Sequence, residues 1–387
     1  MIRLLGLACN FLAKLFIVTI LSILFIASLF YLPTSFFDFP DTKPFLGHFI
    51  YNPYQSHADS VFRANFHAHS KAWKGITDGN DTEQELFDAY TQHGYDIASI
   101  SNYHSISKYA QSRTDLYIPA YEHGYNILKS HYLVINAEDV SYFDFPLFQT
   151  TSHQQKVIHQ IQKKNKYIAI AHPKFGGGRT FENMHHLVGY DFTEVLNHYR
   201  VSDDFWDEGL SAGKLSWVLG NDDIHNVTTD PSFKMWNMIY SANRHPDSIM
   251  INMKRGCHYA VQSYNGKSDN TFLSCNKIND STFYLKFLNA ADSIQWIGQG
   301  GLVKKTITQS DSATYTFVPA DTYIRAVAFN GNSRILLNPL LRYDGHIVPF
   351  ASTLKASENT VKTWSARTVI ALLSLSFLFL IRKTIYF

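Results

Sequence analysis

Residues 61–69 read VFRANFHAH, a stretch of alternating character that ends in two histidines, His67 and His69. Alternate residues of a β-strand point to the same side, so we expect both imidazoles at one face of a strand end. Further stretches with this period-2 pattern follow along the chain. They predict strands over residues 61–66, 97–101, 116–119, 132–136, 167–171, 193–196 and 216–219.

Segments of helical periodicity lie between several of these strands. A helix is predicted over 82–93, where Thr82 and Glu85 form a capping box and Gly94 is placed to end it. A second helix is predicted over 154–163, with an apolar stripe on one side. Repeated strand–helix units predict a parallel α/β sheet, and this many units in under two hundred residues favour a closed or nearly closed barrel.

The pattern changes after residue 265 to short alternating segments separated by Asn, Asp, Gly and Ser turns. Such segments are typical of a small antiparallel β-sandwich. We therefore expect a βα barrel over 61–257 and a sandwich over 265–345, with linkers at 33–60 and 346–366.

Residues that can bind metal stand at nearly every predicted strand end of the first domain. In a parallel barrel the carboxyl ends of all strands open onto one face, so residues far apart in sequence converge there. A lone His-x-His or His-Pro is usually structural, and only the ordered combination predicts a site. The candidate ligands are His67, His69, Asp78, His104, Glu122, His131, His172, Asp223 and His225.

The order of these pieces resembles the polymerase and histidinol phosphatase (PHP) family of metal-dependent phosphoesterases. The resemblance covers roughly residues 61–226 and rests on an opening HxH, an Asp-Gly loop, an "IPxxE" glutamate, an "AHP" and a closing DxH. It implies a distorted seven-stranded βα barrel and a cluster of two or three divalent ions held by the nine candidate ligands. One departure is Tyr103, which stands where the family usually has Asp before the histidine.

The ligand types indicate the chemistry of the predicted site. Nitrogen and oxygen donors without thiolate suit Zn, Mn or Fe. Asp78, Glu122 and Asp223 supply three negative charges against six positive charges if three divalent ions bind. The excess favours an anionic phosphoester substrate, cleaved by metal-activated hydroxide.

Four residues receive further roles in this hypothesis. Asp223 or His225 would assist proton transfer, and the sequence does not decide between them. Lys174 and Arg179, just beyond His172, are candidates for binding the rest of an anionic substrate, although solvated loop charges would look the same.

Both ends of the chain are apolar. Residues 15–32 carry no charge and match the length of a transmembrane helix, whereas a cleaved signal peptide fits less well. Residues 367–383 predict a second span, although the apolar part, 368–381, covers only about 21 Å as a helix. Basic residues flank both spans on the terminal side, which predicts a cytoplasmic N-terminus (residues 1–14) and C-terminus. The catalytic domain would then be periplasmic or otherwise extracytoplasmic, tethered to the inner membrane.

Composition excludes some alternatives and leaves others open. The formal net charge of only +2 gives no broad positive surface that would bind duplex nucleic acid nonspecifically. Cys257 and Cys275 could form a disulfide in an oxidising compartment or remain free thiols. A metal-dependent amide or ester hydrolase and a noncatalytic exported metal-containing binding protein remain alternatives to the phosphoesterase. The oligomeric state is not predicted.

Overall fold

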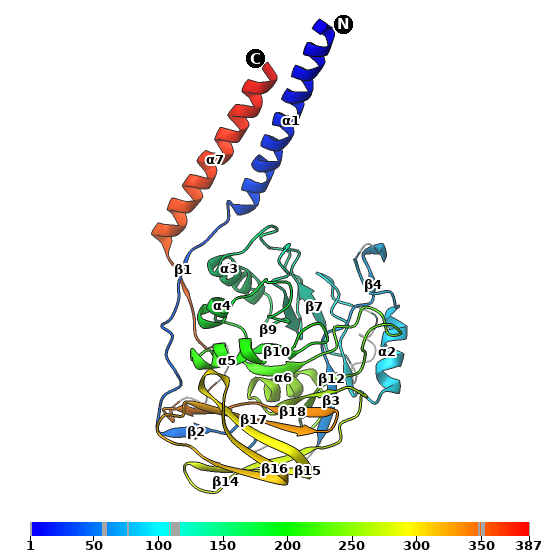
Figure 1. Cartoon of the computed structure of the whole chain (residues 1–387), viewed down its shortest axis with the longest axis vertical. Helices are drawn as coiled ribbons and strands as arrows, with labels where there is room; N and C mark the ends of the chain where they lie inside the picture. The colour runs from blue at the N-terminus through cyan, green and yellow to red at the C-terminus, as the bar shows by residue number, and fades with distance from the viewer. Residues whose placement is uncertain are drawn as a thin grey trace.

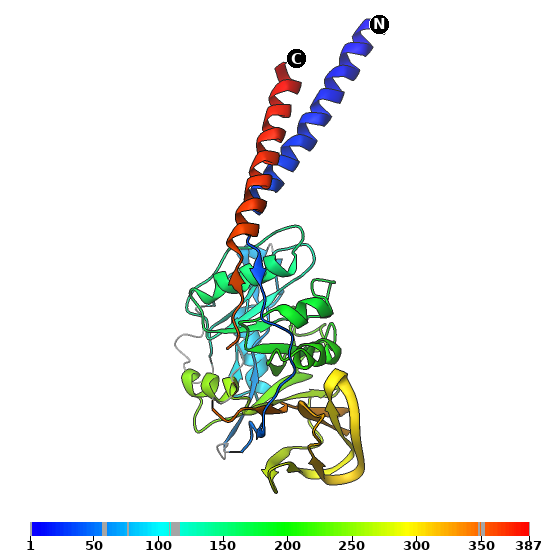
Figure 2. The same cartoon turned by 90° about the vertical axis from the view of Figure 1, so that its left-hand side faces the viewer.

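The computed structural model describes residues 2–55, 60–75, 77–107, 109, 117–346, 349 and 353–386. Two long helices, α1 (Ile2–Tyr31) and α7 (Thr360–Tyr386), leave the same end of the body and run antiparallel, with both chain termini at the far end (Figures 1 and 2). The shorter helices are α2 (Glu83–Gln92), α3 (Thr151–Gln162), α4 (Phe181–His186), α5 (Asp203–Ser211), α6 (Pro246–Lys254), and the 3₁₀ turns η1 (Trp73–Gly75) and η3 (Gln299–Gly301).

Both long helices are long and apolar enough to cross a membrane. α7 begins at Thr360, well before the predicted start of the second span. Its 27 residues therefore extend about 40 Å, with Lys362 and Arg367 in the part next to the body and the uncharged residues 368–381 beyond them. A hydrogen bond of 2.7 Å joins Ser28 Oγ of α1 to Ser374 Oγ of α7.

The two chain segments at the base of these helices are tied together. Strand β1 (Phe37–Asp38) pairs with β20 (Ser357–Glu358) in antiparallel fashion. The Arg367 guanidinium donates to Thr34 O at 2.8 Å and to Ser35 Oγ at 3.1 Å. The predicted linkers 33–60 and 346–366 thus contain paired strands that join the bases of the two helices to each other.

A five-stranded sheet has the order β11-β10-β9-β8-β7. β9, β10 and β11 are parallel, whereas β8 is antiparallel to both of its neighbours. The expectation of a wholly parallel sheet is therefore wrong for β8. Only a loop separates β7 from β8, and a short connection can only return a strand antiparallel to the one before it. The bounds are β7 (Ala120–His123), β8 (Tyr132–Ile135), β9 (Tyr167–Ile170), β10 (Phe192–Leu196) and β11 (Trp217–Gly220).

An eleven-stranded sheet joins the first predicted domain to the second. Its main path is β14-β15-β17-β18-β13-β12-β3-β6, with β16, β19 and β2 attached to it. The strands are β2 (Phe49–Tyr51), β3 (Val61–Asn65), β6 (Ile97–Ala98), β12 (Met235–Tyr240), β13 (His258–Ser263), β14 (Phe272–Lys277), β15 (Thr282–Gly298), β16 (Leu302–Thr316), β17 (Tyr323–Asn330), β18 (Ser333–Leu337) and β19 (Leu340–Tyr343). A small hairpin is formed by β4 (Lys71–Ala72) and β5 (Thr77–Asp78).

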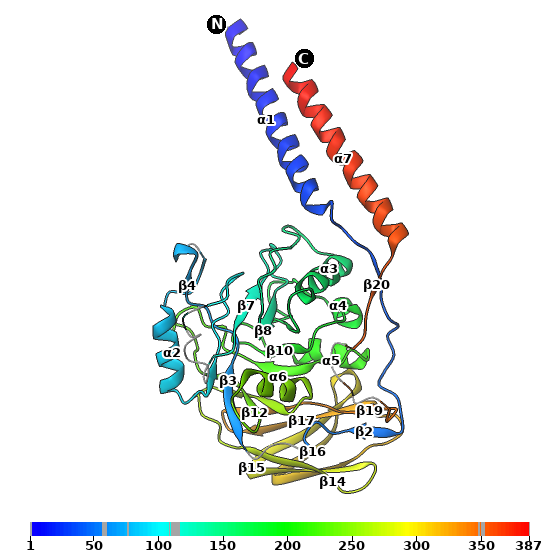
Figure 3. The same cartoon turned by 180° about the vertical axis from the view of Figure 1, so that it is seen from behind.

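The region between the predicted barrel and sandwich is thus occupied by β13, which pairs with β12 on one side and β18 on the other. A buried ion pair adds to this connection: Arg325 of β17 contacts Asp207 of α5 through two hydrogen bonds, of 2.7 and 2.6 Å. The long β15–β16 hairpin lies at the end of the body opposite the two helices (Figures 1 and 3).

Two isolated bridges connect the two sheets. Tyr103 pairs with Glu122 of β7, and Ala68 pairs with Ile224, which follows β11; both bridges are parallel. Ends of β3, β6, β7 and β11 are thereby brought around one region of the molecule.

The predicted helices agree with the structure. α2 begins after Thr82, whose capping box with Glu85 is present, and Gly94 follows its end with a φ of 72°. α3 covers 151–162 and buries the predicted apolar stripe. Cys257 and Cys275 are buried free thiols, so the disulfide left open by the sequence is not formed.

Candidate metal centre

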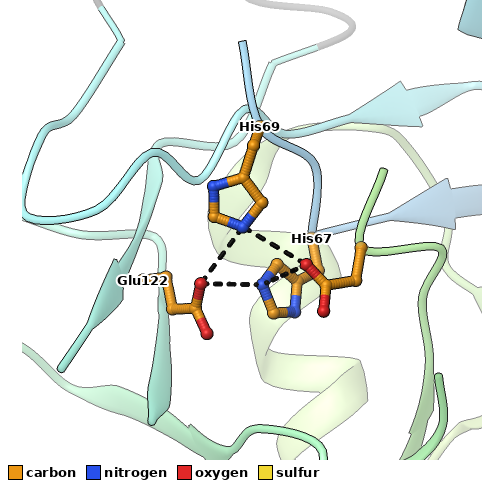
Figure 4. A group of neighbouring side chains, drawn as sticks. His67, His69 and Glu122 are labelled. Atoms are coloured by element: carbon orange, nitrogen blue, oxygen red, sulfur yellow. Dashed lines mark ion pairs between the residues drawn. The ribbon is translucent and has the colours of Figure 1, made fainter. Parts of the chain in front are cut away.

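Four buried side chains converge at the joined strand ends. Glu122 Oε2 lies 3.1 Å from His69 Nε2 and 3.3 Å from His67 Nε2 (Figure 4). Asp223 Oδ1 lies 3.2 and 3.3 Å from the Nε2 atoms of His67 and His69. Four potential ligand atoms therefore surround a common point, although they come from positions up to 156 residues apart (67 to 223).

Glu122 also belongs to a second group of candidate ligands. Its other oxygen, Oε1, lies 2.7 Å from His131 Nδ1 and 3.1 Å from His172 Nε2. All three side chains are buried. One carboxylate thus stands between two sets of donors, an arrangement suited to two neighbouring ions that share Glu122.

The donors of the first group fit a divalent cation. Within the described part of the chain, His67 Nε2, Glu122 Oε2 and Asp223 Oδ1 are buried and have no hydrogen-bond partner. A buried polar atom without a partner loses free energy that a bound ion can restore. Imidazole nitrogen and carboxylate oxygen together suit the divalent transition metals.

The electrostatics of the site also favour a cation. Burial alone lowers the pKa of His67, but surrounding carboxylates, of which Asp223 and Glu194 act most strongly, raise it well above 6.5. Burial raises the pKa of Glu122, yet His131 and His67 outweigh that effect and hold it well below its usual value. A site that draws positive charge onto a fully buried imidazole can accept a metal ion in place of the proton.

Two of the clustered ligands have unusual backbone conformations. His172 has a φ of 25° and Asp223 a φ of 53°. Positive φ costs a residue with a side chain about 1–3 kcal/mol and is found mainly where function requires it. Both residues come directly after or near the end of a strand, where the chain must turn sharply to aim the side chain at the cluster.

Glu194 is a functional candidate that sequence reasoning missed. It is fully buried in β10, and its Oε1 lies 2.9 Å from His67 Nδ1. Its Oε2 accepts from the backbone N–H of His172 at 2.9 Å and from Asn197 Nδ2 at 3.0 Å. A carboxylate at Nδ1 keeps the proton there and directs the Nε2 lone pair of His67 to the cluster. The available signal was a charged residue in the middle of a short buried strand.

The remaining predicted ligands occupy different positions. The His225 ring stacks on that of His69 at 4.3 Å, beside the first group, and is only partly buried. His104 lies in neither group formed by the described residues: Nδ1 bonds to Ser141 O and Nε2 accepts from Gly124 N–H. The side chain of Asp78 lies outside the described residues, so its role stays a prediction.

The two predicted substrate-binding residues already have partners in the protein. Lys174 Nζ lies 2.6 Å from the exposed carboxylate of Asp204. Arg179 is buried and donates to Tyr132 Oη at 3.0 Å and to His131 O at 3.2 Å. Arg179 therefore supports the backbone of a candidate ligand from behind, and substrate contact by either residue stays a prediction.

A cleft of about 650 Å³ lies next to the cluster. His131 of the second ligand group lines it, and so does Tyr103, whose ring contacts His69. The two rings are tilted by 31° to each other, with centroids 4.9 Å apart. The cleft has a mainly aromatic wall and one lysine. It is lined by Trp73, Tyr103, His104, Gly124, Tyr125, Lys129, His131 and Tyr142.

No protein-family model and no curated protein match the sequence. Among solved structures, the chain is similar to a two-domain protein of Bacteroides vulgatus that contains a predicted PHP-like metal-dependent phosphoesterase. The two are 13% identical, the alignment covers 79% of this chain and 97% of that chain, and the TM-score is 0.43. The functional argument therefore depends on the side chains of this chain.

Proposed function

We propose that this protein is a metal-dependent phosphoesterase held at a membrane by α1 and α7. The observation that carries the proposal is the buried cluster of His67, His69, Glu122 and Asp223, extended by His131 and His172 through the shared Glu122 carboxylate. A structural metal site needs only four ligands, whereas these two groups offer more donors than one ion can use. The ions would be two or three divalent ions of Zn, Mn or Fe.

The proposed architecture of the site is a distorted ring of strands. Two isolated bridges and the ladders of both sheets support a closed order of strands whose ends surround the cluster. The ring would contain the seven strands β3, β6, β7, β8, β9, β10 and β11. Because β8 is reversed, its first end lies beside the last ends of β7 and β9, which is why His131 precedes its strand whereas His172 follows one.

Divalent ions bound here would activate water and stabilise the charge of a phosphoryl group. Glu122 holds the two ligand groups together, and Glu194 fixes the proton on His67 Nδ1. For proton transfer we favour His225 over Asp223. Its Nδ1 lies 3.2 Å from Asp223 O and can donate there, which leaves Nε2 to take up or release a proton beside the cluster.

Charge favours a phosphoester over a neutral substrate. Glu122 and Asp223 carry two negative charges, and two divalent ions would bring four positive charges. The net charge of the site with two ions would therefore be positive even when the carboxylate of Glu194 is included. An anionic phosphoryl group would neutralise this excess charge. A carboxyl ester or an amide would gain little from this charge in the ground state.

We expect inorganic phosphate to inhibit the metal-loaded enzyme competitively, because it presents the same tetrahedral anion without a leaving group. The measurement is the initial rate of p-nitrophenyl phosphate hydrolysis by the full-length chain at increasing phosphate concentration. Sulfate, which carries fewer protons but a similar shape, serves as the control anion and should compete more weakly. Noncompetitive behaviour, or none, would argue against an anion site at the metals.

The membrane part of the proposal makes a separate prediction. Basic residues flank the spans on the terminal side, so both termini should be cytoplasmic and residues 61–345 extracytoplasmic, in the inner membrane. Alkaline phosphatase fused after Tyr343 should be active, whereas the matched fusion after Tyr386 should be inactive. A cytoplasmic signal from the first fusion would overturn this orientation.

A further inference from the structure

Two neighbouring surface loops expose a group of apolar and aromatic side chains. Ile127 is 66% exposed, Tyr142 62% and Phe148 55%. A backbone hydrogen bond of 3.0 Å from Ile127 N–H to Pro146 O links the loops. We call this group the apolar rim; it consists of Tyr125, Ile127, Leu128, Tyr142, Leu147 and Phe148. Side chains of this kind are uncommon in such density on a surface that faces only water.

The apolar rim contacts the end of α1 directly. The ring of Tyr31, the last residue of α1, stacks on Phe148 at 5.1 Å between centroids. Its hydroxyl donates to Phe148 O and accepts from Phe148 N–H, both at 2.9 Å. β7 and α3 lie at the end of the body nearest the helices, and β14 and β16 lie at the opposite end (Figures 1 and 3). A membrane crossed by α1 would therefore meet the apolar rim.

The apolar rim also borders the cleft beside the candidate metal centre. Tyr125 and Tyr142 belong to the rim and line the cleft, which continues inward to His131. Lys129, an exposed cation in the same loop as Ile127, lines the cleft as well. A path bounded by aromatic rings and one positive charge thus leads from the end of α1 to the cluster.

We propose that the substrate is a phosphoester of a membrane-resident amphiphile, which enters the cleft across the apolar rim. This inference rests on the proposed phosphoesterase function and on its membrane tether. Aromatic and aliphatic side chains of the rim would sit in the lipid interface, where such residues are favoured. Lys129 would attract the anionic headgroup, and the acyl or other apolar part would remain in the bilayer. A water-soluble phosphoester would need none of these features.

The first test measures where the rim lies. The full-length chain with Cys9→Ser receives a single fluorescent label at Ile127→Cys, or at Leu302→Cys on β16 as the matched control, and is reconstituted in phosphatidylcholine vesicles. Lipid-attached nitroxide should quench the label at position 127 about threefold more than the label at position 302. Equal quenching would overturn the proposal. So would efficient crosslinking of position 127 between two copies of the chain, because the rim would then be a protein interface.

The second test measures substrate presentation with the metal-loaded full chain. We compare phosphatidate and phosphatidylglycerol in phosphatidylcholine vesicles with glycerol phosphate and glycerophosphoglycerol in solution. At least one lipid should be hydrolysed with a kcat/KM about tenfold or more above that of its soluble counterpart. Soluble counterparts that react as well as the lipids would overturn the lipid assignment while leaving the phosphoesterase function intact. Absence of any phosphoester hydrolysis would overturn both.

A variant pair separates docking from chemistry. Ile127 and Phe148 do not line the cleft, so Ile127→Gln with Phe148→Gln should lower lipid hydrolysis about fivefold and leave p-nitrophenyl phosphate hydrolysis within about twofold. Leu302→Gln with Val303→Gln, a pair equally exposed on β16, should change neither rate. An equal loss on both substrates in the rim variant would contradict a role in lipid access.

Discussion

Replacement of both His67 and His69 by alanine is expected to lower phosphoester hydrolysis about a thousandfold or more while the chain keeps its fold. The two imidazoles supply half of the four donors in the first ligand group, so their loss should release an ion and the activated water with it. Strands β3 and β7 are held by apolar packing, which includes Ala64 and Tyr121, and by backbone pairing with β12 and β8, which the substitution leaves in place. The measurements are the hydrolysis rate and the circular dichroism spectrum.

The matched control for this variant is His185→Ala with His186→Ala. These adjacent histidines of α4 pair with the partly exposed and exposed carboxylates of Glu208 and Glu182. The control removes the same number of imidazoles from a place away from the cluster and should retain full activity. Equal rates in the two double variants would show that His67 and His69 are not needed for the reaction.

Glu122→Gln is expected to remove about one ion per chain and to lower the rate about a hundredfold or more. The amide keeps the size of the side chain but removes the negative charge that both ligand groups share, and its nitrogen cannot act as a ligand. Elemental analysis of the purified variant gives the metal content, and the same sample gives the rate.

Glu138→Gln provides the control for Glu122→Gln, because Glu138 is an exposed carboxylate that pairs with Lys166 at the surface. It should keep the metal content and rate of the unmodified chain. Full metal occupancy in Glu122→Gln would mean that this carboxylate is not a ligand, and the assignment of the second group would fail with it.

The cluster could be predicted from the sequence because each ligand stands next to or at the end of a strand that the local sequence pattern indicates. His67 and His69 follow one alternating run, and Glu122, His172 and Asp223 each stand where a strand ends or turns. A position at a strand end does not show whether the ring nitrogens of a histidine are available to bind a metal ion. His104 stands at a predicted strand end too, yet its ring nitrogens contact the backbone at Ser141 and Gly124.

Features that depend on distant pairing could not be predicted in this way. Glu194 acquires its role only through contacts with His67 and with the backbone of His172, and a single buried glutamate has no spacing pattern. The continuity of the large sheet depends on β13 meeting β18, about seventy residues later. Likewise, Tyr31 and Phe148 are 117 positions apart in the chain, so neither apolar segment indicates the contact that places the rim beside α1.

The reversal of β8 was missed for a different reason. Residues 132–135 form a continuous apolar run that is buried on both faces, and such a run does not distinguish a parallel from an antiparallel strand. The loop between Glu122 and His131 is too short for a crossover helix, and that length was the available evidence for an antiparallel return.

The most direct measurement of the central claim is a chelation and reconstitution assay on the full-length chain. Hydrolysis of p-nitrophenyl phosphate and bis(p-nitrophenyl) phosphate is followed before chelation, after it, and after addition of Zn, Mn or Fe, with p-nitrophenyl acetate as the carboxyl ester for comparison. We predict that hydrolysis of at least one phosphoester is lost on chelation and restored by an ion, and that the acetate is not a substrate. Metal-dependent hydrolysis of the acetate with no phosphoester turnover, or phosphoester turnover that persists without metal, would contradict the account.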